Sequence, residues 1–122
     1  MDDMPIIPRD AGADVRAYFD AKTRQYLRHV LSDAIIQEHR RDPQAQHRSE
    51  PLGRLLFYFK NLPLDQQYAL RRMPHGSYRI CTIPRPGHAP VEVDPTDYPD
   101  EPSGFHGVFL RKIKNLMDKN DG

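Results

Sequence analysis

A cluster of prolines in the second half of the chain restricts its possible folds more than any other feature of the sequence. Six of the twelve prolines fall between positions 84 and 102, namely Pro84, Pro86, Pro90, Pro95, Pro99 and Pro102. Proline has no backbone N–H and a fixed φ, so neither a helix nor a central strand can continue through such a segment. We therefore predict an irregular, proline-rich segment over residues 84–104 that wraps over a surface, with one short extended piece at residues 91–93.

Before this cluster, apolar and aromatic residues recur every three or four positions. They are Val15, Tyr18, Phe19, Tyr26, Leu27, Val30, Leu31, Ala34 and Ile35. This spacing is typical of an amphipathic helix, and Asp42-Pro43 marks its end. We predict a single helix of about 27 residues, roughly 40 Å long at 1.5 Å per residue. Because a small domain does not need so long a helix, part of it should project toward another molecule.

Two further segments have helical spacing. Ser49 is a typical N-cap for a shorter helix that ends at Asn61 and Pro63, with apolar residues at Leu52, Leu55, Leu56 and Phe59. The helical period returns after Ser103-Gly104, in Phe105, Val108, Phe109, Ile113, Leu116 and Met117. This pattern predicts a C-terminal helix with Ser103 as its cap.

The segment between these helices favours strands, although its first part is ambiguous. Residues 77–83 are rich in β-branched and aromatic side chains, and Pro74-His75-Gly76 before them is typical of a turn. Within residues 66–73, Tyr68 and Leu70 alternate as in a strand, whereas Asp65-Gln66-Gln67 could equally open a helical turn. The strong second strand favours a β-hairpin.

Together these elements predict an α+β fold that is mostly helical, with a long N-terminal helix, a second shorter helix, a β-hairpin, a proline-rich wrap and a C-terminal helix. A chain of 122 residues has room for one small domain, which we place at residues 14–122 after an extended arm at residues 1–13. Leu, Ile, Val and Phe make up about 22% of the chain, so the core should be thin. Burial of apolar surface against a partner is therefore expected.

Composition also restricts the class of protein. No apolar run approaches the roughly 20 residues of a membrane span. The first residues are acidic, and no apolar run of signal-peptide length follows them. The single cysteine, Cys81, can form neither an internal disulfide nor a CxxC metal site. We expect a cytoplasmic protein.

Six histidines raise the question of a metal site, but their spacing argues against one. They are His29, His39, His47, His75, His88 and His106, and no two stand four apart with a glutamate between them. We expect Asp33 and Glu38 to be ion-pair partners of His29 and His39. Cys81 lies in a predicted strand, where a small buried or half-buried residue is the simplest interpretation. We predict no catalytic, cofactor-binding or metal-ligating residue in this chain.

Clusters of basic residues with aromatic residues between them raise the question of nucleic-acid binding. They comprise Arg24, Arg28, Arg40, Arg41, Arg48, Arg54, Arg71, Arg72, Arg111, Lys112 and Lys114. The 18 Lys and Arg are nearly balanced by 17 Asp and Glu, whereas phosphate binding normally needs an uncompensated basic face. We therefore expect solvated helix faces with ion pairs. A stand-alone nucleic-acid- or protein-binding module remains the alternative function.

A family resemblance rests on two strings of the sequence, HGVFLRKI at residues 106–113 and YRICTI at residues 78–83. It extends to Tyr18-Phe19-Asp20, with the arginine-rich helix that follows, and to the pair Tyr58-Phe59. In this order and spacing, the motifs resemble the small subunit of N,N-dimethylformamidase from about residue 14 to residue 117. None of them is a catalytic signature.

The resemblance implies a specific role. In that family a small chain associates with a much larger chain, which holds a mononuclear iron through tyrosine and glutamate side chains. The complex hydrolyses the amide C–N bond of N,N-dimethylformamide to formate and dimethylamine, with iron polarising the carbonyl and activating water. The small chain supplies no ligand, so the resemblance implies a non-catalytic subunit of an amidohydrolase, with its iron in a large partner chain. The proline density at 84–102 and the basic stretch at 40–48 depart from the family pattern and leave the substrate open.

Overall fold

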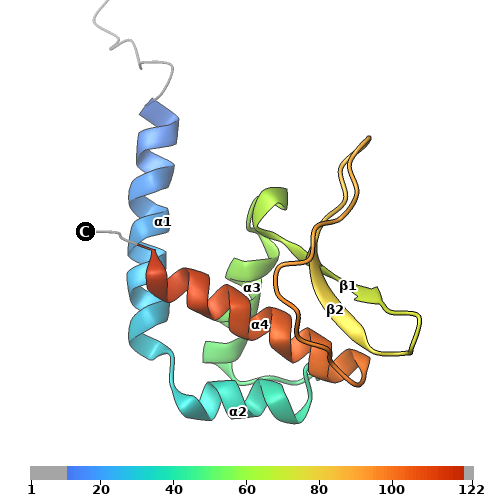
Figure 1. The fold of residues 1–122 in the computed structure, drawn as a ribbon. Helices are drawn as coiled ribbons and strands as arrows, with labels where there is room; N and C mark the ends of the chain where they lie inside the picture. Colours follow the sequence, from blue (N-terminus) through green and yellow to red (C-terminus); the bar gives the residue numbers. More distant parts are fainter. Residues whose placement is uncertain (1–10, 120–122) are drawn as a thin grey trace, which may run out of the picture.

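The structure, a computed structural model, describes the backbone of residues 11–119. In that part of the chain it contains α1 (Ala11–Val30), α2 (Asp33–Arg41), α3 (Glu50–Lys60), a 3-10 helix η1 (Leu64–Gln66), β1 (Tyr68–Arg72), β2 (Tyr78–Thr82) and α4 (Glu101–Asp118) (Figure 1). This order confirms the predicted α+β, mostly helical fold, with a hairpin between the helices.

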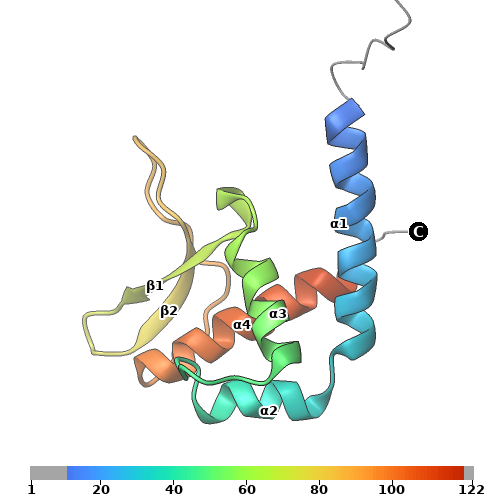
Figure 2. The same cartoon turned by 180° about the vertical axis from the view of Figure 1, so that it is seen from behind.

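Helix α4 is the central element of the fold. It crosses α3, where the rings of Phe109 and Phe59 meet. It also meets α1 near its own C-terminal end and packs on the hairpin near its N-terminal end, while α2 runs below α3 and α4 (Figures 1 and 2). All four helices contribute to the core, through Leu27, Ile35, Leu52, Leu55, Phe59, Phe109, Ile113 and Leu116. The hairpin adds Ile80 and Cys81, which are also buried.

The predicted long N-terminal helix is confirmed as α1, but its predicted extent is wrong, because the chain breaks between α1 and α2 at residues 31 and 32. Ser32 is extended, with φ −144° and ψ 165°, and its hydroxyl accepts a hydrogen bond from the backbone N–H of Ile35. The break lets Leu27 and Ile35 enter one core from two helices that run in different directions (Figure 1). The apolar period therefore continues across the break, and only Ser32-Asp33, a typical cap pair, marks it in the sequence.

The N-terminal end of α1 extends past the rest of the fold. Helix α1 begins at Ala11, so residues 11–13 of the predicted extended arm are helical, and the remainder of that arm lies outside the described residues. Residues 15–20 are all exposed. Figure 1 shows this half of α1 rising beyond the other helices. Part of the helix thus projects as predicted, although the helix is shorter than predicted.

Helix α3 confirms the prediction from its cap and spacing. The Ser49 hydroxyl accepts a hydrogen bond from the N–H of Leu52, and Asn61 closes the C-terminal end. The carboxylate of Glu38, at the end of α2, accepts from the N–H of Ser49 at 2.8 Å and from its hydroxyl at 2.6 Å. Glu38 therefore anchors the start of α3, and its predicted pairing with His39 is wrong.

The hairpin settles the ambiguity at residues 66–73. A single 3-10 turn comes first, and β1 then pairs antiparallel with β2, placing Ala69 opposite Cys81 and Leu70 opposite Ile80. Gly76 supplies the positive φ of 95° that the turn between the strands requires. The predicted hairpin is therefore confirmed.

The proline-rich segment lies along the free edge of β2. The N–H of Thr82 donates to the carbonyl of Val91 at 2.9 Å, and the N–H of Val93 donates to that of Ile80 at 3.1 Å. Further on, Tyr78 and Tyr98 exchange two backbone hydrogen bonds of 2.8 Å. The short extended piece predicted at residues 91–93 is thus confirmed, and it covers an otherwise open strand edge.

Helix α4 begins earlier than predicted. Asp100 is its N-cap and accepts from the N–H of Ser103 at 2.8 Å, so the predicted cap at Ser103 is wrong and residues 101–104 are helical. Gly104 and Gly107 let other elements approach the helix closely: a Cβ at Gly104 would lie 2.7 Å from Leu70, and one at Gly107 would lie 2.6 Å from Tyr98. Among the helices in the described part of the chain, none is long and apolar enough to cross a membrane.

Candidate interaction surface

Cys81 is placed where it cannot act as a nucleophile. It lies in β2, is 3% exposed and pairs with Ala69 across the hairpin. Burial raises the pKa of its thiol, which disfavours the reactive thiolate. This confirms the interpretation of Cys81 as a small buried residue.

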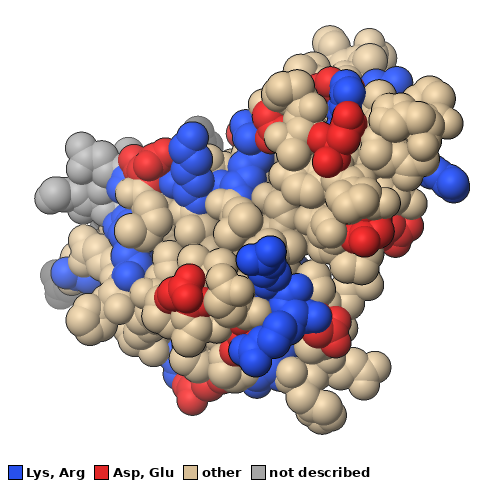
Figure 3. Space-filling model, turned by 60° about the horizontal axis from the view of Figure 1, so that its bottom comes forward, with Lys and Arg blue, Asp and Glu red and all other residues tan. Residues whose placement is uncertain are grey.

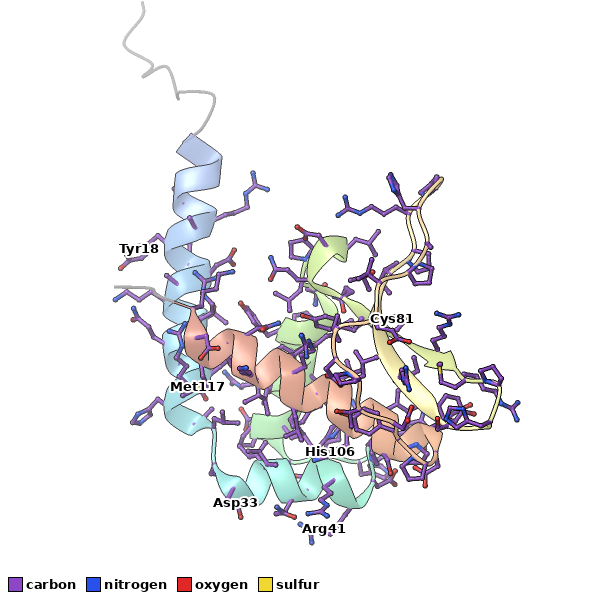
Figure 4. The ribbon with its side chains drawn as sticks, in the orientation of Figure 1. Tyr18, Asp33, Arg41, Cys81, His106 and Met117 are labelled. Carbon is purple, nitrogen blue, oxygen red and sulfur yellow. The ribbon has the colours of Figure 1, made fainter. Side chains whose placement is uncertain are left out.

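Two histidines that are far apart in the sequence meet between α2 and α4. Nδ1 of His39 lies 2.9 Å from Nδ1 of His106, so one ring donates to the other. The ring of Phe109 stacks on His39 with a centroid distance of 3.9 Å. Figure 4 marks His106 where α4 lies above α2. The two rings are therefore held by each other and by the core.

The electrostatics of this pair keep both rings neutral. Burial, followed by the nearby charges of His106 and Arg48, lowers the pKa of His39 to about 4. Burial, followed by Arg40, also lowers the pKa of His106. At neutral pH the pair is a hydrogen-bonded part of the core.

The pair does not make a metal site by itself. Among residues 15–119, no group of three or more His, Cys, Asp and Glu side chains could hold a metal ion. His29, His47 and His88 are exposed, and exposed His75 contacts the hydroxyl of Ser77 at 2.6 Å. An iron centre needs more ligands than the two imidazoles of the pair, so the described residues do not fit an iron site, and the resemblance places the iron in the partner chain.

Arginines at the hairpin end are engaged in ion pairs. Arg79 contacts Asp97 at 2.7 Å and Glu92 at 3.3 Å, and Arg111 contacts Asp94 at 3.2 Å. The hydrogen bond from Arg79 lowers the pKa of Asp97. These charges connect the proline-rich segment to β2 and α4. Figure 3, which brings the α2 side forward, shows basic and acidic side chains interspersed, with one group of basic side chains near the centre.

A wide groove lies between α1 and α3. It measures about 990 Å³, against about 320 and 300 Å³ for two others. Its apolar lining includes Phe19, Tyr26, Leu27, Phe57, Tyr58 and Leu62. Its charged lining consists of five basic residues, Lys22, Arg24, Arg48, Arg54 and Lys119, and two acidic ones, Asp20 and Glu50.

The groove has fixed walls. Arg28 in α1 donates to the carbonyls of Leu116 at 2.8 Å and Lys119 at 2.9 Å, which ties α1 to the C-terminal end of α4. The guanidinium of Arg54 lies 5.6 Å from the ring centroid of Tyr26, across the groove from α3 to α1. The groove is therefore a defined feature of the fold.

Sequence reasoning found the projecting helix but missed the groove and the histidine pair. The groove depends on the break at Ser32, which decides how α1 lies against α3. The histidine pair had a signal: His39 stands four residues after Ile35, on the buried face of α2, and His106 stands three before Phe109. This spacing indicates that His39 and His106 each face the core. It does not indicate which side chain either of them contacts there.

Comparison with known families gives one match. A family model described as the N,N-dimethylformamidase alpha subunit matches residues 14–122, which is the whole chain except its first 13 residues. A search among curated proteins gives no match.

Proposed function

Because the chain belongs to the N,N-dimethylformamidase alpha-subunit family, we propose that it is the small, non-catalytic subunit of a complex that hydrolyses N,N-dimethylformamide or a similar small N-substituted amide. The subunit designation implies a second kind of chain. In this proposal the second chain is larger, carries the catalytic residues and holds the iron. The complex works in the cytoplasm.

The match over residues 14–122 is the observation that carries this proposal. It spans every described helix and strand apart from the first three residues of α1, so the whole fold takes part in the likeness. A match confined to one helix would have supported only a shared motif.

The state of the reactive side chains supports a non-catalytic role. Cys81 is buried with a raised pKa, and His39 and His106 are bonded to each other beside Phe109. A general base must reach the proton that it removes, and a nucleophile must reach the carbonyl carbon. Cys81, His39 and His106 are used in packing, so none of these three side chains is placed for either role.

The exposed aromatic residues support an assembly role. Phe57 is 71% exposed and Phe19 is 61% exposed, and both line the groove between α1 and α3. Grouped aromatic side chains on a surface are typical of sites that bind other proteins. A partner chain would cover them.

The test is to express this chain alone, the large chain alone and both together, and to measure iron content and release of dimethylamine for each. We expect activity from the joint preparation and neither activity nor stoichiometric iron from this chain alone. One equivalent of iron in the isolated chain, lost on replacing His39 and His106, would contradict the proposal. So would full activity of the large chain without this one.

A further inference from the structure

We propose that the groove between α1 and α3 is the docking site for a segment of the partner subunit that carries apolar side chains flanked by acidic ones. The projecting half of α1 extends this surface. The inference rests on the proposed function, because it takes the large subunit as the occupant. It adds which face of this chain makes the contact and what chemistry the partner presents there.

One face of α1 continues the groove beyond the fold. Val15, Phe19, Lys22 and Tyr26 stand at i, i+4, i+7 and i+11, so they share one side of the helix. Val15 is 53% exposed and Tyr26 is 46% exposed. Tyr18, at the edge of this stripe, packs edge-on against Phe19 with a centroid distance of 5.6 Å. The half of α1 that extends past the core still carries exposed apolar side chains. Packing within this chain does not explain them, because a helix needs apolar residues only where it packs against something.

Gly53 is a second, independent indication of close contact. It lies in the interior of α3 and lines the groove, where a Cβ would meet no atom of this chain within 4 Å. Glycine is a much weaker helix former than alanine. Gly104 and Gly107 have a packing reason in Leu70 and Tyr98, whereas Gly53 has none within the described residues. A partner chain that approaches α3 closely at Gly53 would explain why glycine stands at this position.

The charges around the groove indicate acidic groups on the occupant. Arg24 already takes part in another interaction, and Arg54 pairs with Glu50 at 2.8 Å. The other charged side chains that line the groove are three basic ones, Lys22, Arg48 and Lys119, and one acidic one, Asp20. A second copy of this chain would bring a like-charged rim against this one, which disfavours self-association. The apolar floor also distinguishes the groove from a phosphate-binding face, which relies on its basic side chains.

The size and openness of the groove favour a protein segment over a small molecule. At about 990 Å³ it lies at the upper end of ligand pockets, and its aromatic walls stay exposed to solvent. A small amide would leave most of these walls uncovered. A helix with apolar residues at i, i+3, i+4 and i+7 would cover them, as in other helix-in-groove contacts.

The test measures binding of the full-length labelled chain to the purified large subunit by titration. The two contact variants are Phe57→Asp and Phe19→Asp. The matched control is Val91→Asp, because Val91 lies on the proline-rich segment, away from the groove, and its side chain is 63% exposed. We expect the dissociation constant to rise by about 100-fold or more for each contact variant, as for central interface aromatics. The control should stay within about twofold of the unchanged chain.

Gly53→Gln separates binding from folding. Glutamine is the better helix former, and the added atoms enter open space, so the melting temperature should stay the same or rise. The same atoms fill the groove, so affinity for the large subunit should fall by about tenfold or more. A variant that folds better and binds worse has no explanation in misfolding.

Four outcomes would contradict the docking site. If the unchanged chain binds the large subunit and all three groove variants bind equally well, this face is not the contact and the proposed function stands. If the unchanged chain does not bind the large subunit at all, the proposed function fails and the docking site fails with it. If the unchanged chain is a dimer that Phe57→Asp converts to monomer, the occupant is a second copy. If a DNA or RNA oligonucleotide binds and Phe57→Asp releases it, the occupant is nucleic acid.

Discussion

Phe109 is the side chain through which α4 joins the other helices. It is 3% exposed, stacks on His39 of α2 and meets the ring of Phe59 of α3 edge-on at 5.9 Å. The helical spacing predicts that Phe109 lies on the apolar stripe of α4, and its burial confirms this prediction. Its aromatic neighbours lie on α2 and α3, which the helical period alone cannot reveal.

Phe109→Ala should therefore destabilise the chain by about 3 to 5 kcal/mol, because a buried ring is lost and a cavity remains. Urea unfolding of the full-length chain measures this free energy. Phe57→Ala is the control, since a 71% exposed phenylalanine should cost less than about 0.5 kcal/mol. Equal midpoints for the two variants would mean that the side of α4 facing the core is misassigned.

His39 should make stability depend on pH. Its pKa is about 4 in the folded chain against an ordinary value of 6.5, so protons bind more readily to the unfolded chain. The folded state is therefore fully favoured above pH 6.5 and loses stability as pH falls toward 4. Between pH 7 and pH 5 the loss is about 2 kcal/mol, at 1.36 kcal/mol per pKa unit.

His39→Phe tests this dependence, because phenylalanine keeps the stacking on Phe109 and does not titrate. The urea midpoint of the unchanged chain should fall between pH 7 and pH 5, and that of the variant should fall much less. His29→Phe is the control, since His29 is exposed. If the urea midpoint of His39→Phe falls with pH as steeply as that of the unchanged chain, the ring of His39 is not the group that titrates.

At the scale of the elements, the connection from α2 to α3 depends on side-chain hydrogen bonds. Glu38 binds both the N–H and the hydroxyl of Ser49, and Ser49 caps α3. Burial of Leu52, Leu55 and Phe59 depends on where α3 starts. Ser49 therefore links α2 to α3 and fixes where α3 begins relative to the core.

Ser49→Ala should cost about 1 kcal/mol, the usual effect of losing a helix N-cap. Thermal unfolding followed by circular dichroism measures it, with Gln46→Ala, an exposed change in the same connection, as the control. If Ser49→Ala and the control have the same melting temperature, the cap does not contribute to stability and the apolar face of α3 alone holds the helix in place.

The elements also show where sequence reasoning succeeds. Helix α3 and the hairpin were predictable because a local signal, Ser49 in one case and Pro74-His75-Gly76 in the other, agrees with the apolar pattern. The break between α1 and α2 was missed because Leu27, Leu31 and Ile35 keep a helical period across it. Periodicity reports that residues face the core, and it does not report whether one helix or two brings them there.

At the scale of the whole molecule, the two ends of the fold differ. At the hairpin end, Arg79 and Arg111 are paired with acids of the proline-rich segment. At the other end, α1 projects past the core (Figure 2). A groove with aromatic residues in its lining lies between α1 and α3. The charges thus hold the chain together at one end, and the other end presents apolar surface suited to a second chain.

Assembly through an apolar surface predicts insensitivity to salt. An apolar contact retains its affinity as ionic strength rises, and mainly its association rate changes. Binding driven by phosphates weakens by several powers of ten between about 50 and 200 mM salt, because condensed counterions are released. The salt dependence of binding therefore distinguishes a subunit of a protein complex from a nucleic-acid-binding module.

The most direct measurement is size-exclusion chromatography with light scattering on the natively expressed, nuclease-treated protein at about 50 and 200 mM salt. We predict that the chain elutes with a much larger partner chain at both salt concentrations. A monomer that binds oligonucleotides tightly at the lower concentration and releases them at the higher one would contradict the subunit assignment.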